Sequence, residues 1–141
     1  MKLHFLCYSS IRTGNHENLL DEISDILTVA HTFNKKHRIT GVLYYSQGQF
    51  FQYIEGLEQV IEDLFDHIAV DSRHHYIHYY GTFPTSERRF KDWSMKYVQD
   101  NSQVSMLFEQ RKKSLILFDH LSENSLMKLI DDLMNTDETT R

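Results

Sequence analysis

The sequence predicts an α+β fold, in which helices and short strands alternate along a single domain. Three features support this prediction. Two segments have apolar residues at three- and four-residue spacing, several others alternate between two faces, and residues 46–49 form a small polar loop between two aromatic-rich runs. The length of 141 residues, with 40% hydrophobic and 25% charged content, suits one core.

The composition argues against several classes of function. The formal net charge is −5, and acidic and basic residues are mixed, so no basic stripe favours direct binding of nucleic acid. The longest apolar runs, such as residues 115–118, are far shorter than the roughly 20 residues of a membrane helix. The N-terminus also lacks the apolar core of a signal peptide, so we expect no membrane role and a cytoplasmic location. The single cysteine, Cys7, excludes an internal disulfide and a multi-cysteine zinc site.

The first strand and the first helix follow from two periodicities. Residues 2–9 alternate as a strand, which puts Tyr8 and Cys7 on opposite faces. Residues 11–16 form a loop in which Asn15 is expected to cap the next helix. The apolar stripe of that helix comprises Leu19, Leu20, Ile23, Ile26, Leu27, Ala30 and Phe33. Asn34 continues the same stripe near the end of the helix, where an apolar side chain is expected.

Residues 39–56 are predicted to form a β-hairpin around the polar loop that contains Gly48. Alternation puts Phe50, Gln52 and Ile54 on one face and Phe51, Tyr53 and Glu55 on the other. Gln52 therefore lies between large apolar side chains on the face expected to meet the helices. A buried amide without partners costs about 1–3 kcal/mol, so a polar group is expected against it.

The remaining elements complete a β-α-β-β-α-β-β order. Gly56 ends the hairpin, and residues 57–68 have the apolar spacing of a second amphipathic helix. Residues 71–75 form a polar loop after this helix, and residues 76–83 are predicted to form a strand that ends at Pro84. Residues 94–98 form a last short strand with Met95 and Tyr97 on one face. This order predicts a ferredoxin-like sheet with both helices on one face.

The composition and spacing of residues change after residue 98. Residues 99–103 are wholly polar, residues 104–118 suggest one helical segment, and Ser122 is a suitable cap for another. The apolar residues of the second segment are Leu126, Leu129, Ile130, Leu133 and Met134. We therefore divide the chain into a first domain, residues 1–98, and a helical extension, residues 99–141, that covers the other face of the sheet. The last residues, 136–141, are expected to fray.

A ferredoxin-like strand order makes the first and third strands neighbours, so Tyr8 and Gln52 can meet under the helices. Asn34 lies near them, and Ile26 and Ile68 line the two helices. A phenol and two amides between apolar walls suit a flat heteroaromatic ligand with carbonyl and ring-nitrogen acceptors.

The chain resembles a known family, the BLUF domains, which are blue-light sensors that use FAD. The matching segments are LCYSS at 6–10, Asn34, ITGVLYY at 39–45, FFQYIEG at 50–56, DSRHH at 71–75 and FKDWSM at 90–95. They occur in the family's order and spacing over residues 1–98, and their succession is specific although each segment alone is weak.

The resemblance implies roles for residues around a non-covalently bound FAD. Tyr8 corresponds to the family's photoactive tyrosine, and Gln52 to the glutamine that bridges it to flavin N5 and the C4 carbonyl. Asn34 corresponds to the side chain that pairs with the pyrimidine edge. Ile26 and Ile68 would pack on the faces of the ring.

Further positions match the family outside this centre. Asp71, Arg73 and His74 resemble the loop that holds the C2 side of the ring and the ribityl chain. Trp93 and Met95 match the pair on the last strand that passes the signal outward. Two positions depart from the family's pattern: Phe33 stands where a polar residue is common, and His67 where some members have arginine.

The implied mechanism is a photocycle without enzymatic turnover. Light would make Tyr8 supply an electron and a proton, and recombination would leave Gln52 rotated or tautomerised. The change would pass through the last strand and the C-terminal helices, or the sheet face, to a protein partner or to a change in homo-oligomeric assembly.

Other interpretations remain open at the level of sequence. The same fold could be a light-insensitive protein-interaction module, in which Tyr8, Gln52 and Asn34 are ordinary structural residues. A small hydrolase such as an acylphosphatase would need a phosphate-binding loop, for which the chain offers only Arg12 and one glycine. A zinc site at His74 and His78 has no further ligand in the pattern.

Overall fold

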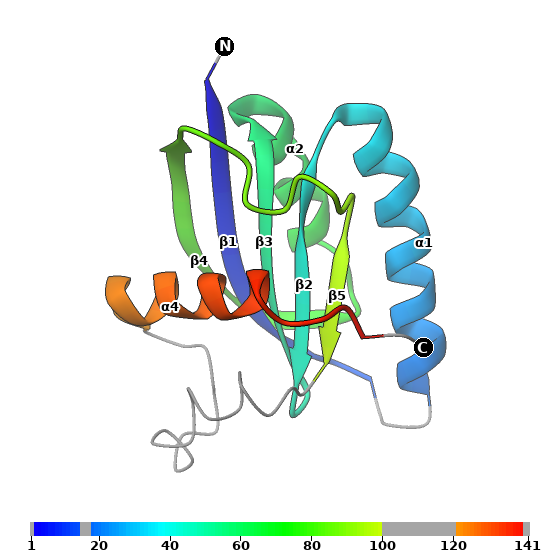
Figure 1. The fold of residues 1–141 in the computed structure, drawn as a ribbon. Helices are drawn as coiled ribbons and strands as arrows, with labels where there is room; N and C mark the ends of the chain where they lie inside the picture. The colour runs from blue at the N-terminus through cyan, green and yellow to red at the C-terminus, as the bar shows by residue number, and fades with distance from the viewer. Residues whose placement is uncertain (1, 15–17, 100–120, 140–141) are drawn as a thin grey trace.

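The computed structural model describes residues 2–14, 18–99 and 121–139 (Figure 1). Its elements are β1 (Leu3–Arg12), α1 (Leu19–His37), β2 (Thr40–Ser46), β3 (Gln49–Leu57), α2 (Glu58–Ala69), β4 (His74–Thr85), β5 (Lys96–Gln99) and α4 (Glu123–Met134). The predicted order of helices and strands is therefore correct. The expected segment at 104–118 lies outside the described residues.

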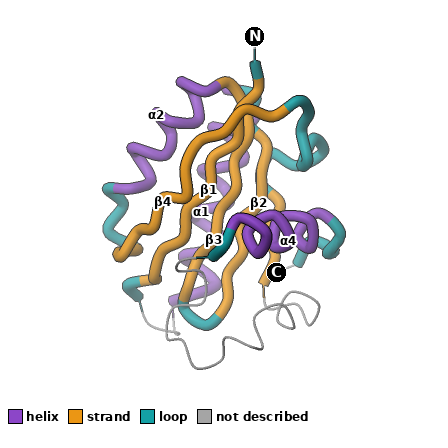
Figure 2. Tube along the Cα trace, turned by 90° about the vertical axis from the view of Figure 1, so that its left-hand side faces the viewer, coloured by secondary structure: helices purple, strands orange, loops and turns teal. Residues whose placement is uncertain are grey.

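The sheet has the strand order β4-β1-β3-β2-β5 in the described part of the chain. β1 pairs antiparallel with both β3 and β4, and β5 pairs parallel with β2. Figure 2 shows α2 and α4 on opposite sides of the sheet, and Figure 1 shows α4 crossing the front of it. The ferredoxin-like prediction, with α1 and α2 on one face and the C-terminal helix on the other, is confirmed.

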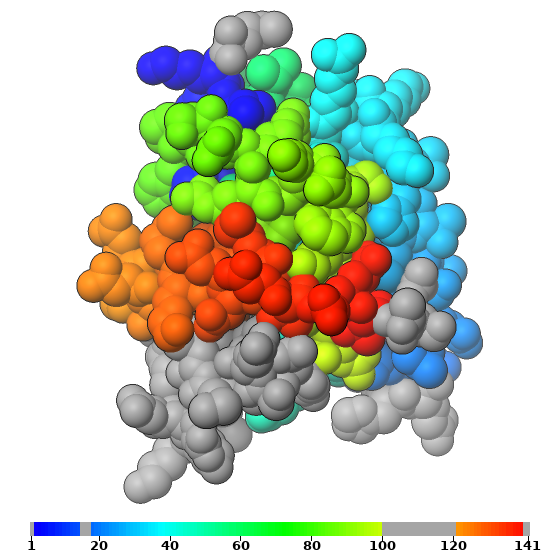
Figure 3. Space-filling model, viewed as in Figure 1, coloured from blue at the N-terminus to red at the C-terminus, as the bar shows by residue number. Residues whose placement is uncertain are grey.

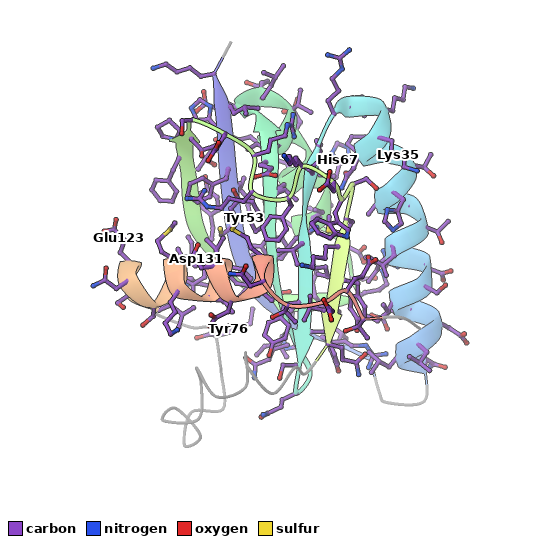
Figure 4. All side chains as sticks on the ribbon, viewed as in Figure 1. Lys35, Tyr53, His67, Tyr76, Glu123 and Asp131 are labelled. Carbon is purple, nitrogen blue, oxygen red and sulfur yellow. The ribbon has the colours of Figure 1, made fainter. Side chains whose placement is uncertain are left out.

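Alternation along the strands separates the core into a cluster on each face. Leu6, Tyr8 and Ile54 pack under α1 and α2, whereas Cys7 and Tyr53 pack toward α4. Tyr53 of β3 and Asp131 of α4 are labelled in Figure 4. Since α4 covers the second face, the central strands are buried on both sides, as their burial patterns record.

The hairpin between β2 and β3 turns at Gln47 and Gly48. Both residues have positive φ, 51° and 80°, as a type I′ turn requires. Such a turn matches the twist of the two strands, so the predicted hairpin is present with Gly48 at its tip.

Several boundaries differ from the prediction. β1 continues to Arg12, whose N–H donates to Gly48 O at 2.8 Å, so part of the expected loop is strand. β3 passes Gly56 before it ends at Leu57. β4 runs through Pro84 to Thr85. Proline has no backbone N–H, and this is tolerated because β4 is an edge strand, whose outward side pairs with no neighbouring strand. α1 begins at Leu19, and the expected cap Asn15 lies outside the described residues.

The connection between β4 and β5 is fastened to the sheet by Glu55. Its buried carboxylate accepts hydrogen bonds from Thr40 Oγ1 at 2.7 Å and Tyr53 OH at 2.8 Å. It also accepts from the backbone N–H groups of Arg89 and Phe90, both at 2.8 Å. A fully bonded carboxylate at this point fixes the start of the segment that leads to β5.

The C-terminal part contains a capped helix and an ordered tail. Ser122 caps α4 as predicted, since its side chain accepts from Ser125 N at 3.1 Å. The expected fraying is wrong for residues 136–139: Thr139 N donates to Tyr97 O at 2.8 Å, and Gln99 N donates to Thr139 Oγ1 at 3.0 Å. Figure 3 shows this segment lying across β5.

Across the described ranges, no helix combines the length and the apolar character that a bilayer crossing requires.

Candidate functional site

A cavity of about 350 Å³ lies between α1, α2 and the sheet. This volume falls within the range of roughly 300–1,000 Å³ that is typical of ligand sites. Residues from both helices and from β1, β3 and the end of β4 nearest α2 line it. The sequence-predicted residues among them are Tyr8, Ile26, Asn34, Gln52, Ile68, Asp71, Arg73, His74 and Met95.

The centre of the cavity wall is a hydrogen bond between two strands. Tyr8 and Gln52 are direct partners in the β1–β3 register, and the Tyr8 hydroxyl donates to Gln52 Oε1 at 2.5 Å. Both side chains are buried. Burial, followed by the charge of Asp71, raises the pKa of Tyr8, so the phenol stays protonated and acts as the donor. The polar partner expected for Gln52 is therefore present.

Gln52 also contacts the residue that precedes β5. Its Nε2 donates to Met95 Sδ at 3.8 Å, and Met95 is fully buried. A carboxamide has an acceptor end and a donor end of nearly equal size. Here the acceptor end meets Tyr8 and the donor end meets Met95, so reversal of the amide would change both contacts.

Asn34 lines the cavity and carries an unsatisfied acceptor. The residue is 1% exposed, and its Nδ2 donates to Ser94 O at 2.7 Å. Its Oδ1 is buried and has no hydrogen-bond partner among the described residues. Such an atom needs a donor, because a buried polar group without one is costly. A ring N–H beside ring carbonyls, as on the pyrimidine edge of a flavin, would donate to this oxygen, so Asn34 fits that group.

The end of the cavity near α2 is polar and internally bonded. Arg73 Nη2 contacts Asp71 Oδ2 at 2.5 Å, and hydrogen bonding from Arg73 lowers the pKa of Asp71. His74 Nε2 donates to Ile68 O at 2.6 Å, and in the neutral ring Nδ1 then accepts from the hydroxyl of Ser10 at 2.7 Å. These bonds hold a carboxylate, a guanidinium and an imidazole in fixed positions at the opening.

The side walls of the cavity are apolar. Ile26 comes from α1 and Ile68 from α2, and both are partly buried. Phe33 and His67, the two departures from the family pattern, also line the cavity, and Figure 4 labels His67. Apolar walls with polar groups at one edge suit a flat aromatic ring inserted between the helices.

Trp93 lies apart from this arrangement. Of the described residues, those lining the cavity do not include Trp93, which packs instead with the cluster on the α4 side. Lys96 Nζ stands 4.4 Å from the centre of its ring. Of the predicted pair, therefore, only Met95 contacts Gln52.

Sequence reasoning missed the supporting role of three residues. Ser94 accepts from Asn34 through its carbonyl, and its hydroxyl is hydrogen-bonded to His31 Nδ1 at 2.6 Å. His31 lies one helical turn before Asn34, so the i, i+3 spacing was the available signal. Ser10 is the third, and its signal was its place two residues after Tyr8, on the same face of β1.

The competing sites find little support. Arg12 is buried and its guanidinium contacts Glu22 Oε2 at 2.7 Å, so it is committed to an ion pair rather than to a phosphate loop. Among the residues that the structure describes, no group of three or more metal-ligating side chains is present, and His74 bonds to Ser10 and Ile68.

Comparison with known proteins gives a family match. Residues 3–96 match the family model described as BLUF, sensors of blue-light using FAD. The alpha and beta subunits of photoactivated adenylate cyclase from Euglena gracilis are each 33% identical, over 95 and 94 residues respectively. These alignments cover 67% of this chain but only 9% and 11% of those relatives, so the chain spans about a tenth of their length.

Solved structures match over nearly the whole chain. The photo-activated state of BlsA superposes with a TM-score of 0.91 and 37% identity, covering 99% of each chain. The ground state of BlsA gives 0.89 and 37%, covering 98% of this chain and 91% of that one. The dark state of BlrB, a BLUF protein, gives 0.79 and 27%, covering 95% and 96%.

Proposed function

Since the chain belongs to the BLUF family, sensors of blue light using FAD, we propose that light reverses the hydrogen bonds of Gln52 and that β5 passes this change to a protein partner. The observation that supports this most is the continuous contact from the Tyr8 hydroxyl through the Gln52 amide to Met95 sulfur, at the wall of the cavity. BLUF domains are sensor modules, which agrees with a function without enzymatic turnover.

The residues of the cavity suggest how FAD is held. Ile26 and Ile68 would pack on the two faces of the ring system, and Asn34 Oδ1 would accept a hydrogen bond from its pyrimidine edge. Asp71, Arg73 and His74 would hold the C2 side and the ribityl chain. This assignment gives the orphaned oxygen of Asn34 a donor.

The photochemistry uses Tyr8 as the reacting side chain. When bound, the flavin supplies absorption of blue light and an acceptor for one electron. Tyr8 gives up an electron and its phenolic proton, and takes both back on recombination. While the phenolic proton is away, Tyr8 cannot donate to Gln52 Oε1, so the amide is free to reverse by rotation or tautomerisation. The reversed state persists until the hydrogen bonds relax.

The output is proposed to leave through the last strand. Met95 precedes β5, and the residues after it contact α4 and residues 136–139. The relatives in Euglena gracilis are described as photoactivated adenylate cyclases, which suggests that the present chain also regulates another protein activity. In this proposal residues 1–98 sense light and residues 99–141 present the signal to the partner.

Spectroscopy tests the sensor function directly. Purified protein should bind FAD and be yellow, and blue light should shift its flavin bands to longer wavelength, reversibly in the dark. A colourless protein that does not take up added FAD would contradict the proposal. A pull-down in darkness and in blue light then identifies the partner.

The second candidate is a light-insensitive interaction module with the same fold, favoured by the extensive packing of α4 on the sheet. It predicts that Gln52→Leu binds the partner normally and that light has no effect on binding. If light changes partner binding in the wild type but not in Gln52→Leu, the result supports the photoreceptor.

A further inference from the structure

Lys96 is a buried lysine next to the residue that contacts Gln52. It is 1% exposed and begins β5, directly after Met95. Because side chains alternate along a strand, Met95 faces the cavity under α1 and α2, whereas Lys96 faces α4. Two consecutive residues thus connect the two sides of the sheet.

The ammonium group of Lys96 binds the end of α4. Nζ donates to Leu133 O at 2.9 Å and to Met134 O at 3.2 Å, the last two residues of the helix. The final carbonyls of a helix have no partner within it, and a cation at this end is favoured by the helix dipole. The described helix has no basic residue in its own last turn, so Lys96 supplies this charge from the sheet.

Aromatic rings complete the environment of Lys96. Its Nζ lies 4.4 Å from the centre of the Trp93 ring and 6.0 Å from that of Phe90. These distances allow cation–π attraction, which is strongest when the cation is desolvated. The same burial lowers the pKa of Lys96, while the nearby carboxylates of Glu138 and Asp137 oppose the change. The side chain of Lys96 is therefore held by contacts from α4 and from the segment before β5.

We propose that the described arrangement is that of the dark state, in which Lys96 is the positioning residue that holds α4, and that Lys96 releases the helix when Gln52 reverses. This inference rests on the photocycle proposed above and names the contact through which β5 acts. It assigns α4 as the element that responds, and the ion–carbonyl contact as the latch.

The chemistry of the contacts gives the direction of the change. In the described state Gln52 Nε2 donates to Met95 Sδ. Reversal of the amide by rotation would put its oxygen against the sulfur, and two acceptors do not bond. Met95 would then move, and because it is covalently joined to Lys96, the start of β5 would shift relative to Leu133 and Met134. Light is therefore expected to loosen the end of α4.

Hydrogen–deuterium exchange of the full chain with FAD tests this inference. In the wild type, amides of residues 123–134 should exchange at least about fivefold faster in blue light than in darkness, the lower end of usual allosteric coupling. In Lys96→Met, the spectral shift should remain, dark exchange should already be fast, and light should add no further increase. A purely structural role would raise both rates and leave their ratio unchanged, which would overturn the proposal.

A matched control lies on the same helix. Lys128 is 63% exposed and pairs with Asp132 at 3.8 Å, so Lys128→Met removes a lysine without touching the latch. It should keep the wild-type ratio of light to dark exchange. Loss of the ratio in Lys128→Met as well would overturn the specific role of Lys96.

Two further results separate the inference from the photocycle. A wild type with a normal spectral shift but no light response in α4 refutes the latch and leaves the photoreceptor intact, whereas absence of the shift refutes both. If Lys96→Met does not fold, ¹⁵N-lysine NMR of the wild type decides. The Lys96 ammonium should be protected from water in darkness and exchange as Lys128 does in light. An identical signal in both states overturns the proposal.

Discussion

Replacing Tyr8 by phenylalanine removes one oxygen atom from the wall of the cavity. The lost hydroxyl donates to Gln52 Oε1 at 2.5 Å, and both side chains are buried. The amide oxygen would lose its donor, which costs about 1–3 kcal/mol. For a domain near this size, each kcal/mol lowers the Tm by roughly 2–4 °C. Because the ring remains, Tyr8→Phe should still fold and bind FAD.

Tyr8→Phe should abolish the light-induced spectral shift rather than reduce it. Phenylalanine has no proton to give and is a poor electron donor, so the red shift of the flavin bands under blue light should disappear. Absorption spectra before and after illumination measure the shift, and thermal unfolding measures the loss of stability.

The chain offers a matched control for this substitution. Tyr97 OH donates to Gln99 Oε1 at 2.8 Å, a second tyrosine–glutamine hydrogen bond, and Tyr97 does not line the cavity among the described residues. Tyr97→Phe should lose stability but keep the red shift. A normal photocycle in Tyr8→Phe, or its equal loss in Tyr97→Phe, would refute the assignment of Tyr8 as donor.

Three other perturbations have defined outcomes. Asn34→Ala removes the orphaned acceptor and should weaken FAD binding by about tenfold, as titration of the apoprotein would measure. Glu55→Gln turns an amide donor toward the N–H groups of Arg89 or Phe90 and should destabilise the fold by about 1–3 kcal/mol in urea unfolding. The pKa of Asp71 lies below its ordinary value of 3.8, chiefly because Arg73 hydrogen-bonds to it. The ionised carboxylate therefore stabilises the fold fully when the pH is above the ordinary pKa, and this stabilisation is lost as the pH falls through the lower pKa of the folded state. Asp71→Asn cannot ionise, so it should lose less stability than the wild type between about pH 5 and pH 2.

Each of these outcomes has a contrary result. Unchanged FAD affinity in Asn34→Ala would exclude its contact with the ring, and an unchanged urea midpoint in Glu55→Gln would show that Glu55 does not fasten the β4–β5 connection. Equal acid sensitivity of Asp71→Asn and the wild type would exclude the ionised Asp71 as a source of stability.

The central contact of the site was predictable because it depends on periodicity alone. Alternation fixes the faces of Tyr8 and Gln52, and the ferredoxin-like order makes their strands neighbours. The position of Trp93 was not predictable in the same way, since it lies before β5 in a segment without periodic pattern. Its position depends on Glu55, which holds the preceding residues Arg89 and Phe90 and is distant in sequence, and on the side chain of Lys96, which packs against its ring.

The C-terminal end also could not be predicted from the local sequence. Residues 136–139 are polar and short, so their composition suggests fraying. They are ordered by backbone and hydroxyl hydrogen bonds to Tyr97 and Gln99, some 40 residues earlier. Contacts of this kind leave no local signal. Pro84 is similar, because a proline ends a central strand but is accepted on the edge strand β4.

We expect the hydrogen bonds between Thr139 and β5 to oppose self-association. They occupy two backbone groups of β5, Tyr97 O and Gln99 N, that would otherwise be open to pairing with a neighbouring molecule. A substitution or attachment that lifts this segment away would bare the margin of the sheet and invite intermolecular strand pairing. Displacement of the tail should therefore favour aggregation and should be detected first as turbidity at high concentration.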